Sequence, residues 1–405
     1  MSQERSAGNL QGVVLILPIT LTVMGAALLA PIVPLLMQQF KDIENAIYWV
    51  PLLLSIPALC IALGAPVAGI LADKVGRRKL LIWSMIIYAF SGMSPILLSD
   101  YWPIFISRIC VGLCEAVIIT CSTTLIGDYF SGDKRDKWLG SQAALATVTA
   151  MFLFPLSGFL GSQFGWKGPF LLYGSSLILA ILVLLFTWEN RFSSRQRSVE
   201  SDEKKASRGR LPKSHMLTVC AFTLVGGVFF YILMFQLSTA LGHFDINDAS
   251  LSGLLLSITA LGVPIGAIAY RYAHKLLGTK SLVFLEFAIL AVGFISMSHA
   301  ENYQWFILAG FFNQFGAGML LPTMLTWAVS KLEFDVRGLG VGIWQSTFAF
   351  GQFVSTLAFS WVATQVGSEN YLSTFQIFGA IALLTCFIAA LFLRKQMSKK
   401  QEQYA

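Results

Sequence analysis

Long apolar runs recur along the whole chain, and short polar segments separate them. Each run holds about 20 residues, the length that an α-helix needs to cross the hydrocarbon core of a bilayer. The pattern predicts an all-α membrane protein with twelve transmembrane helices. The predicted centres are Leu21, Leu59, Ile87, Leu113, Thr149, Leu179, Phe229, Leu261, Ala291, Leu320, Phe350 and Leu383.

A polar, Ser-rich segment interrupts this pattern near the middle of the chain. It reads ENRFSSRQRSVESDEKKASRGRLPKS from Glu189 to Ser214 and leaves six apolar runs on each side. We therefore expect an N-terminal half at residues 1–189, a linker at 190–214 and a C-terminal half at 215–405. The composition is typical of a flexible cytoplasmic tether. A regulatory role of this segment is the alternative.

The composition supports a chain that faces lipid. Hydrophobic residues make up 56% of the 405 residues and charged residues only 12%, whereas a soluble domain carries about 25% charged residues. Twelve spans of this length leave room for short loops but not for a large soluble domain. The first apolar run follows a polar start and lacks a small-residue cleavage pattern, so we expect a retained first helix rather than a signal peptide.

The lysines and arginines indicate the orientation of these helices. If both termini lie in the cytoplasm, nearly all 28 basic residues fall on the cytoplasmic side. The exceptions are Lys41 and Lys167 outside, and Arg108 within the membrane. This is the distribution that the positive-inside rule describes, and it predicts a multi-pass protein of the cytoplasmic (inner) membrane. The net charge of +7 thus reflects topology, and nucleic-acid binding is not expected because no basic patch is interleaved with exposed aromatics.

Cofactor chemistry finds no support in the sequence. All six cysteines lie within predicted spans, and Cys110 and Cys114, one turn apart, have no histidine beside them. The four histidines stand singly at span ends, which fits neither a metal site nor the nucleophile–base pair of a membrane enzyme. No glycine-rich phosphate loop follows a strand. We expect no metal, no cofactor and no enzymatic activity, and a monomer whose partners are the lipid bilayer, protons and a small-molecule substrate.

The two halves show the signs of an internal repeat. A constant shift superposes FSGDKRDKWLG, residues 130–140, on LEFDVRGLGVG, residues 332–342. Each segment is the predicted cytoplasmic turn between the fourth and fifth spans of its half. Parallel six-span repeats are the architecture of one large class of transporters, in which the solute binds near the membrane midplane between the halves.

Two opposite charges lie deep inside the predicted fourth span. Arg108 and Glu115 are seven residues apart, so both leave one face of the helix, roughly 10 Å apart along its axis. An ionisable group at this depth costs on the order of 3 kcal/mol even on lenient insertion scales, and such groups are usually functional. The pair predicts a site that binds a proton or a charged solute. The alternative is a buried ion pair that locks two helices together.

The turn after the second span carries a recognisable motif. It reads GILADKVGRRK from Gly69 to Lys79 and resembles the signature loop of the major facilitator superfamily, with every defining position present. Gly69 would allow a close helix approach and Gly76 a turn with positive φ. Asp73 and Arg77 can pair across the turn, and Asp128 at the end of the fourth span can join them. The resemblance implies that this cluster is a conformational latch.

The fourth span resembles several proton-coupled branches of that family. The residues Arg108-x-x-x-Gly112-x-x-Glu115-Ala116 match a pattern of drug:proton antiporters, spinster-like lipid carriers and organic-anion symporters. The resemblance implies that Arg108 is the coupling arginine and Glu115 the proton carrier. Since arginine stays protonated, the glutamate must be the member that titrates. Its proton affinity would change with its solvation and with its distance from the guanidinium.

The fifth and first spans bear on the direction of transport. Antiporters of the family typically carry Gly-x-x-x-Gly-Pro-x-x-Gly-Gly in the fifth span, of which this chain keeps Pro155 and Gly158 as an expected break in the helix. The first span has Thr20 and Thr22 but no carboxylate, which argues against cationic drugs. We expect efflux of a drug or of an amphipathic or chelating metabolite. A proton-coupled symporter for an organic anion is the alternative.

Further polar residues within the spans are candidates for the substrate cavity or for hydrogen bonds between helices. They are Gln142, Thr147, Tyr231, Gln236, Asn313, Gln314, Trp344, Gln345 and Gln352. Glu286, about two turns into the ninth span, could titrate as a second proton site. We favour a structural role for it, because it is close enough to the cytoplasmic surface for its carboxyl to snorkel.

Overall fold

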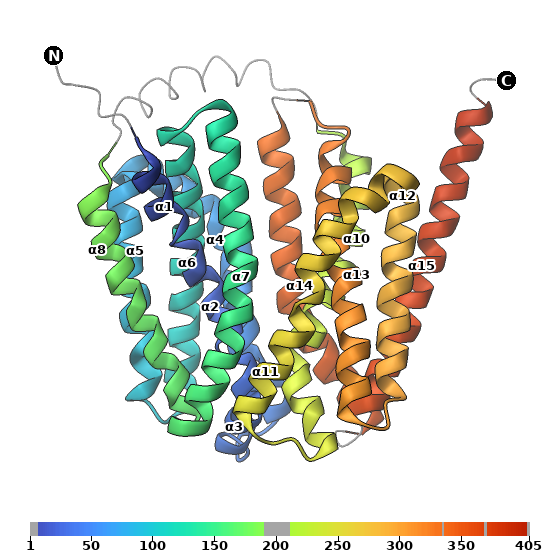
Figure 1. The fold of residues 1–405 in the computed structure, drawn as a ribbon, viewed down its shortest axis with the longest axis horizontal. Coiled ribbons are helices and arrows are strands. Elements are labelled where there is room, and N and C mark those ends of the chain that lie inside the picture. Colours follow the sequence, from blue (N-terminus) through green and yellow to red (C-terminus); the bar gives the residue numbers. More distant parts are fainter. Residues whose placement is uncertain (1–6, 190–210, 334–335, 368–370, 403–405) are drawn as a thin grey trace. The chain divides into compact units, whose positions relative to one another are not determined.

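The computed structural model describes residues 7–189, 211–333, 336–367 and 371–402, with side chains up to residue 391. Within these residues all regular elements are helices. The chain forms two compact units, Met1–Arg210 and Leu211–Ala405 (Figure 1). Most of the predicted linker, residues 190–210, lies outside the described residues. Its last two residues are helical, because α10 already begins at Lys213.

The first unit builds its first span from short pieces, whereas α4, α6 and α7 are long helices. Pro18 separates the first two pieces, since a proline has no N–H to donate to the preceding turn. The elements are α1 (Asn9–Ile16), α2 (Ile19–Ala27), η1 (Ala30–Ile32), α3 (Val33–Gln39), α4 (Ala46–Val75), α5 (Arg77–Met93), η2 (Ser94–Ile96), α6 (Tyr101–Tyr129), α7 (Gly132–Phe164), η3 (Gly165–Gly174) and α8 (Ser175–Phe186).

The second unit is also helical throughout its described part. Its elements are α10 (Lys213–Leu241), η4 (Gly242–Phe244), α11 (Ala249–Ala260), α12 (Gly262–Ser298), α13 (Tyr303–Val329), α14 (Arg337–Val366) and α15 (Tyr371–Glu402). Inside α12 the chain turns at Gly278, which has a φ of +69°. The corresponding residue of the first half, Gly76, has a φ of +101° and separates α4 from α5. The repeat seen in the sequence thus places a glycine at the same turn of each unit.

The twelve predicted spans can be located in these elements. In the described residues, nine stretches are long and apolar enough to cross a membrane. Two of them, Gly132–Phe186 and Ala249–Ser298, are 55 and 50 residues long, and each folds back once and holds two spans. The remaining span is α14, which is less apolar because it carries Gln345 and Gln352. The predicted all-α fold with twelve membrane helices is confirmed.

Small residues bring the helices of each unit close together. In the first unit, a Cβ on Gly112 of α6 would collide with the backbone of Pro57 on α4. In the second unit, a Cβ on Gly293 of α12 would collide with Asn313 on α13. Small side chains at crossing points are the usual means of packing helices in lipid, where the hydrophobic effect does not drive them together.

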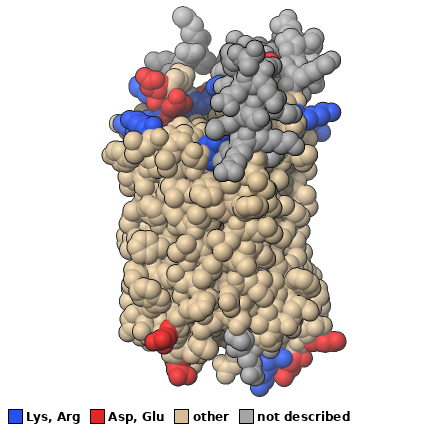
Figure 2. Space-filling model, turned by 90° about the vertical axis from the view of Figure 1, so that its right-hand side faces the viewer, with Lys and Arg blue, Asp and Glu red and all other residues tan. Residues whose placement is uncertain are grey.

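The outer surface is apolar between two charged ends. Large side chains such as Phe90, Phe152 and Trp361 are exposed on the helices. Figure 2 shows one face of the molecule, on which the visible described Lys, Arg, Asp and Glu side chains lie toward the two ends. The surface between these ends is that of a protein surrounded by hydrocarbon.

Two predictions about helix geometry are wrong. We expected Pro155 and Gly158 to break the fifth span, but α7 continues from Gly132 to Phe164 with Pro155 inside it. A proline removes one ladder hydrogen bond without ending a membrane helix when its neighbours compensate. We also expected a close helix approach at Gly69, but a Cβ there would meet no described atom within 4 Å. The surroundings of this glycine therefore leave space for a side chain.

Candidate functional site

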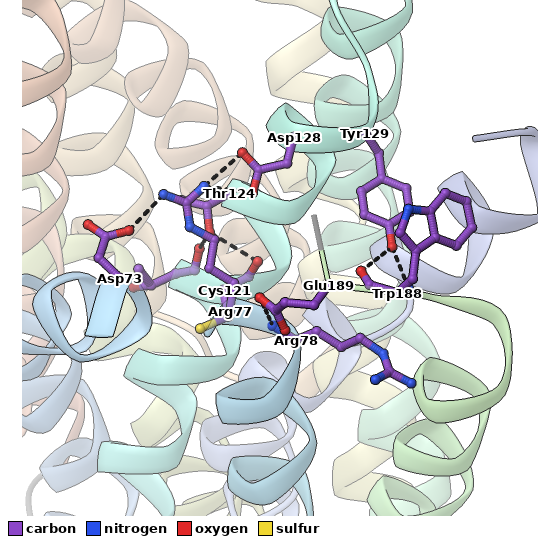
Figure 3. A network of polar contacts seen from close by, with 10 residues as sticks. Asp73, Arg77, Arg78, Cys121, Thr124, Asp128, Tyr129, Trp188 and Glu189 are labelled. Carbon is purple, nitrogen blue, oxygen red and sulfur yellow. Dashed lines mark hydrogen bonds and ion pairs between the residues drawn. The ribbon is translucent and has the colours of Figure 1, made fainter. Parts of the chain in front are cut away.

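An ion-pair network joins three helix ends in the first unit (Figure 3). Arg77, the first residue of α5, donates to Asp128 on α6 with 2.8 and 2.7 Å from its Nη1 to the two carboxylate oxygens. Its other terminal nitrogen lies 2.8 Å from Asp73 Oδ1, one turn back on α4. The structure therefore brings together the three residues of the predicted latch. The side chain of Asp128 is 3% exposed and that of Asp73 is 63% exposed.

A third carboxylate lies beside this network, and the sequence analysis missed it. Glu189 follows α8, and its carboxylate accepts from the backbone N–H groups of Arg78 (3.5 Å) and Lys79 (3.4 Å) in the first turn of α5. A negative charge at a helix N-terminus is favourable because the N–H groups there have no helical partners. Next to it, Tyr129 on α6 donates to the carbonyl of Trp188 at 2.6 Å. A lone acid directly after an apolar span was the available signal.

The two buried charges of α6 do not pair with each other. Both Arg108 and Glu115 are buried, and no ion pair joins them in the part of the chain that the structure describes. Instead Arg108 Nη1 donates to the Tyr173 hydroxyl at 2.6 Å. The guanidinium lies 4.8 Å from the ring centroid of Tyr173 and 5.3 Å from that of Phe170. These cation–π contacts stabilise a desolvated cation, and they argue against the alternative of a locking ion pair.

Two tyrosines fill the space between the charges. The Tyr88 ring on α5 lies 5.1 Å from the Tyr173 ring. The Tyr88 hydroxyl donates to the backbone carbonyl of Leu21 at 2.5 Å and also lies 3.4 Å from Glu115 Oε1. A buried tyrosine usually finds a partner for its hydroxyl, so tyrosines inside apolar spans were a usable signal. The sequence did not indicate that these two face the acid and the arginine.

The Glu115 carboxylate lies directly against α2. A Cβ built on Gly25 would collide with the carboxylate oxygen and with the carbon that bears it. Only glycine leaves room for the acid at this position of the first span. Glu115 thus contacts α2 through Gly25 and, by way of Tyr88, the Leu21 carbonyl. A change of its protonation state would be felt by the backbone of that helix.

Two nitrogens of the Arg108 guanidinium remain without a hydrogen-bond partner among the described residues. They are Nε and the second terminal nitrogen, and both are buried. An unpaired buried donor on a charged group is costly. This arginine can therefore donate to a further acceptor, such as a carboxylate, in another state of the protein.

Glu286 does not reach the surface, so the predicted snorkelling is wrong. Its side chain is fully buried in the second arm of α12, and its Oε1 accepts from Thr323 on α13 at 2.5 Å.

Several predicted cavity residues make hydrogen bonds between helices. Gln142 on α7 accepts from Thr123 and donates to Ser122 on α6, at 3.2 and 3.3 Å. Asn313 on α13 donates to the Leu290 carbonyl of α12 at 3.0 Å. Gln314, also on α13, donates to the carbonyl of Phe230 on α10 at 3.3 Å. These amides join neighbouring helices, which was the alternative considered for them.

The other candidates lie around an aromatic cluster or at the surface. The Phe348 ring lies 5.5 Å from that of Tyr231 and 6.4 Å from that of Trp344. The indole nitrogen of Trp344 is buried without a partner among the described residues. Within the described part of the chain, the hydroxyl of Thr147 donates to the Ala143 carbonyl of its own helix. Gln236 is buried, whereas Gln345 is exposed.

Comparison with known proteins places this arrangement in context. A family model described as Major Facilitator Superfamily matches residues 15–334 and 217–404. The chain is 21% identical to the class H tetracycline resistance protein of Pasteurella multocida, over 96% of this chain and 98% of that protein. It is 24% identical to a multi-drug resistance efflux pump PmrA homolog of Lactococcus lactis subsp. lactis (strain IL1403), over 74% of each.

Solved structures share the fold at low sequence identity. A D-xylose-proton symporter superposes with a TM-score of 0.77 at 15% identity, covering 93% of this chain and 96% of that one. A bacterial homolog of the human lysosomal transporter Spinster, in an inward-facing and unoccupied conformation, gives a TM-score of 0.74 at 14% identity, over 95% and 97%. At such identities the likeness concerns the fold alone.

Proposed function

The chain belongs to the major facilitator superfamily of membrane transporters, and we propose that it exports an amphipathic organic solute in exchange for protons. The relatives named as tetracycline resistance proteins and as a multi-drug efflux pump support export. Members of this family are transporters rather than enzymes. We propose that the protein lies in the cytoplasmic membrane with both termini in the cytoplasm, because that orientation satisfies the positive-inside rule. We further propose that it acts as a monomer.

The single observation that carries proton coupling is the environment of Glu115. Its carboxyl is buried and lies against α2, next to one tyrosine hydroxyl and without a paired cation in the described residues. A carboxyl so desolvated is most stable in its neutral form. Movement of α2 that admits water, or that brings the Arg108 guanidinium nearer, would favour release of the proton. Glu115 is then the carrier, and Arg108 sets its affinity.

A second candidate function rests on Arg108. Its two unpartnered nitrogens could bind a carboxylate of the solute, since a guanidinium is suited to such acceptors. The protein would then be a proton-coupled symporter for an organic anion. Export of a carboxylate-bearing chelating metabolite would use the same contact, so the direction of proton movement must separate these possibilities.

Proteoliposomes with a pH-sensitive dye in their lumen test the proposal. An inward gradient of solute is imposed for a panel that begins with tetracycline and includes other drugs and carboxylate-bearing metabolites. We expect the lumen to become alkaline as the solute enters, because each entering solute is exchanged for protons that leave. Liposomes without protein provide the background.

The sign of the pH change separates the candidates. A lumen that acidifies as the solute enters would assign the protein to the symporters. Solute entry without any pH change, under gradients of either direction, would contradict proton coupling altogether.

We propose that Asp73, Arg77 and Asp128 form a latch that breaks and re-forms as the transporter alternates between its states. The two aspartates of the network differ in exposure, so their contributions to the stability of the protein should differ too. Replacing the buried Asp128 with alanine should cost about 1.5–3 kcal/mol, the range for hydrogen bonds to charged groups. Replacing the exposed Asp73 should cost less than about 1 kcal/mol. Melting temperatures of the purified variants measure this difference.

Transport rates of the same variants test the latch itself. Both substitutions should lower the rate of solute movement, because a transporter without the latch spends less time in one of its states. Equal losses of stability at the two positions would contradict the structure's asymmetry. Unchanged rates in both variants would show that the network is structural and not a latch.

A further inference from the structure

A cavity of about 670 Å³ lies beside the ion-pair network, entirely within the first unit. The ends of α4, α5, α6 and α8 form its walls. This volume is within the range of pockets that hold small ligands. We call it the α5 groove, because residues of α5 line it from the helix start to the third turn.

Cations without acidic partners line one end of the α5 groove. Lys74, Arg78 and Lys79 contribute to its wall, and none of them forms an ion pair within the part of the chain that the structure describes. Among the described residues, the guanidinium of Arg78 donates to two neutral oxygens, at 2.7 Å to the Leu184 carbonyl and 3.2 Å to the Thr187 hydroxyl. Figure 3 shows its side chain extending away from the Arg77 network.

The acidic residues at this groove already have donors. Asp73 and Asp128 are paired with Arg77, and Glu189 accepts from the first turn of α5. The cations that line the groove still outnumber its three carboxylates, so the net charge of the lining residues is positive. An anion is the complementary ligand.

The rest of the α5 groove is lined by apolar side chains, some of which are exposed. Lys79, Ile82, Trp83 and Ile86 lie at i, i+3, i+4 and i+7, which is one face of a helix. Trp83 is 55% exposed, and Leu184 on α8, across the groove, is 51% exposed. Along this face the cation comes first, and the indole of Trp83 follows it between the aliphatic side chains of Ile82 and Ile86. A phospholipid has the same order, with a charged headgroup, an interfacial region favoured by tryptophan, and acyl chains.

We infer that the α5 groove binds an anionic phospholipid, with its phosphate on Lys74, Arg78 and Lys79 and an acyl chain along Ile82 and Ile86. Basic pockets between membrane helices on the cytoplasmic side are suited to such headgroups. A free phosphate would use the cations but not the apolar wall. A role of these lysines in topology alone would give no preference among lipids. The binding does not depend on the transport function proposed above.

Quenching of tryptophan fluorescence by brominated lipids tests this site. The full-length protein in detergent is titrated with brominated phosphatidylglycerol or brominated phosphatidylcholine, and the Trp83→Phe variant identifies the contribution of Trp83. We expect phosphatidylglycerol to quench Trp83 with an apparent affinity about tenfold above that of phosphatidylcholine, given that each basic residue near an anionic surface adds to the attraction. Inorganic phosphate should not displace the brominated phosphatidylglycerol.

Matched double variants separate the site from general charge effects. Lys74→Gln with Lys79→Gln should abolish the preference, and it spares Arg78, whose hydrogen bonds support the fold. Lys275→Gln with Lys331→Gln removes the same charge from exposed positions of the second unit and should keep the preference. The proposal would be overturned if the wild type showed no preference for phosphatidylglycerol, or if inorganic phosphate abolished that preference. It would also be overturned if the preference survived in the Lys74→Gln, Lys79→Gln variant.

Discussion

Replacing Glu115 with glutamine should abolish proton-coupled movement of solute, down to the background of empty liposomes. Glutamine matches the shape of the neutral acid and can still accept from the Tyr88 hydroxyl, which lies 3.4 Å from the carboxyl oxygen. The fold should therefore remain intact. The amide cannot bind or release a proton at the pH values used for transport. A solute gradient can therefore no longer drive proton movement across the membrane.

Exchange of labelled for unlabelled solute separates loss of coupling from loss of binding. Exchange at equal concentrations needs no net proton movement, and it should persist in Glu115→Gln while the solute-driven pH change disappears. Glu44→Gln makes the same chemical change at an exposed position and should behave as the wild type does. Coupled movement that survives in Glu115→Gln would mean that Glu115 is structural and that another group carries the proton.

Much of the fold could be predicted because hydrocarbon imposes a simple constraint on sequence. Every backbone polar group must be satisfied within its own helix, so runs of about 20 apolar residues locate the spans. The turn at Gly76 also follows from local sequence, since its positive φ is available to few other residues. The run around Pro155 was misjudged because the sequence does not show which neighbours support a helix at a proline.

In the candidate site, too, the local features could be predicted from the sequence and the contacts between distant helices could not. Asp73 and Arg77 are one turn apart, so their pairing is local and could be predicted. Glu115 and Arg108 were identified from their cost in the membrane. The contacts of Tyr88 and Gly25 with Glu115 could not be predicted, because they join helices that are distant in sequence. The contacts of Arg108 with the aromatic rings of η3, which lie far from it in sequence, could not be predicted either.

Replacing Gly25 with alanine should strongly reduce proton-coupled transport while the protein still folds. The new Cβ would occupy the place of the Glu115 carboxylate. That carboxylate is the far end of a flexible side chain, so it can move aside at a cost of about 1–3 kcal/mol for overpacking. Alanine favours a helix over glycine by about 1 kcal/mol, which offsets part of this cost. The loss should thus appear in coupling, measured as the initial rate of the solute-driven pH change, rather than in folding.

Two further variants test whether the loss of coupling arises from the contact between position 25 and the Glu115 carboxylate. Gly140→Ala, on α7, introduces the same methyl group where no described atom lies within 4 Å, and its coupling should match the wild type. Glu115→Asp shortens the acid by one methylene. In combination with Gly25→Ala it should therefore recover coupling relative to Gly25→Ala alone. If Gly25→Ala couples protons to solute at the wild-type rate, the carboxylate need not lie against α2. Glu115 would then act without the first span, and the proposed link between its protonation and the movement of α2 would be lost.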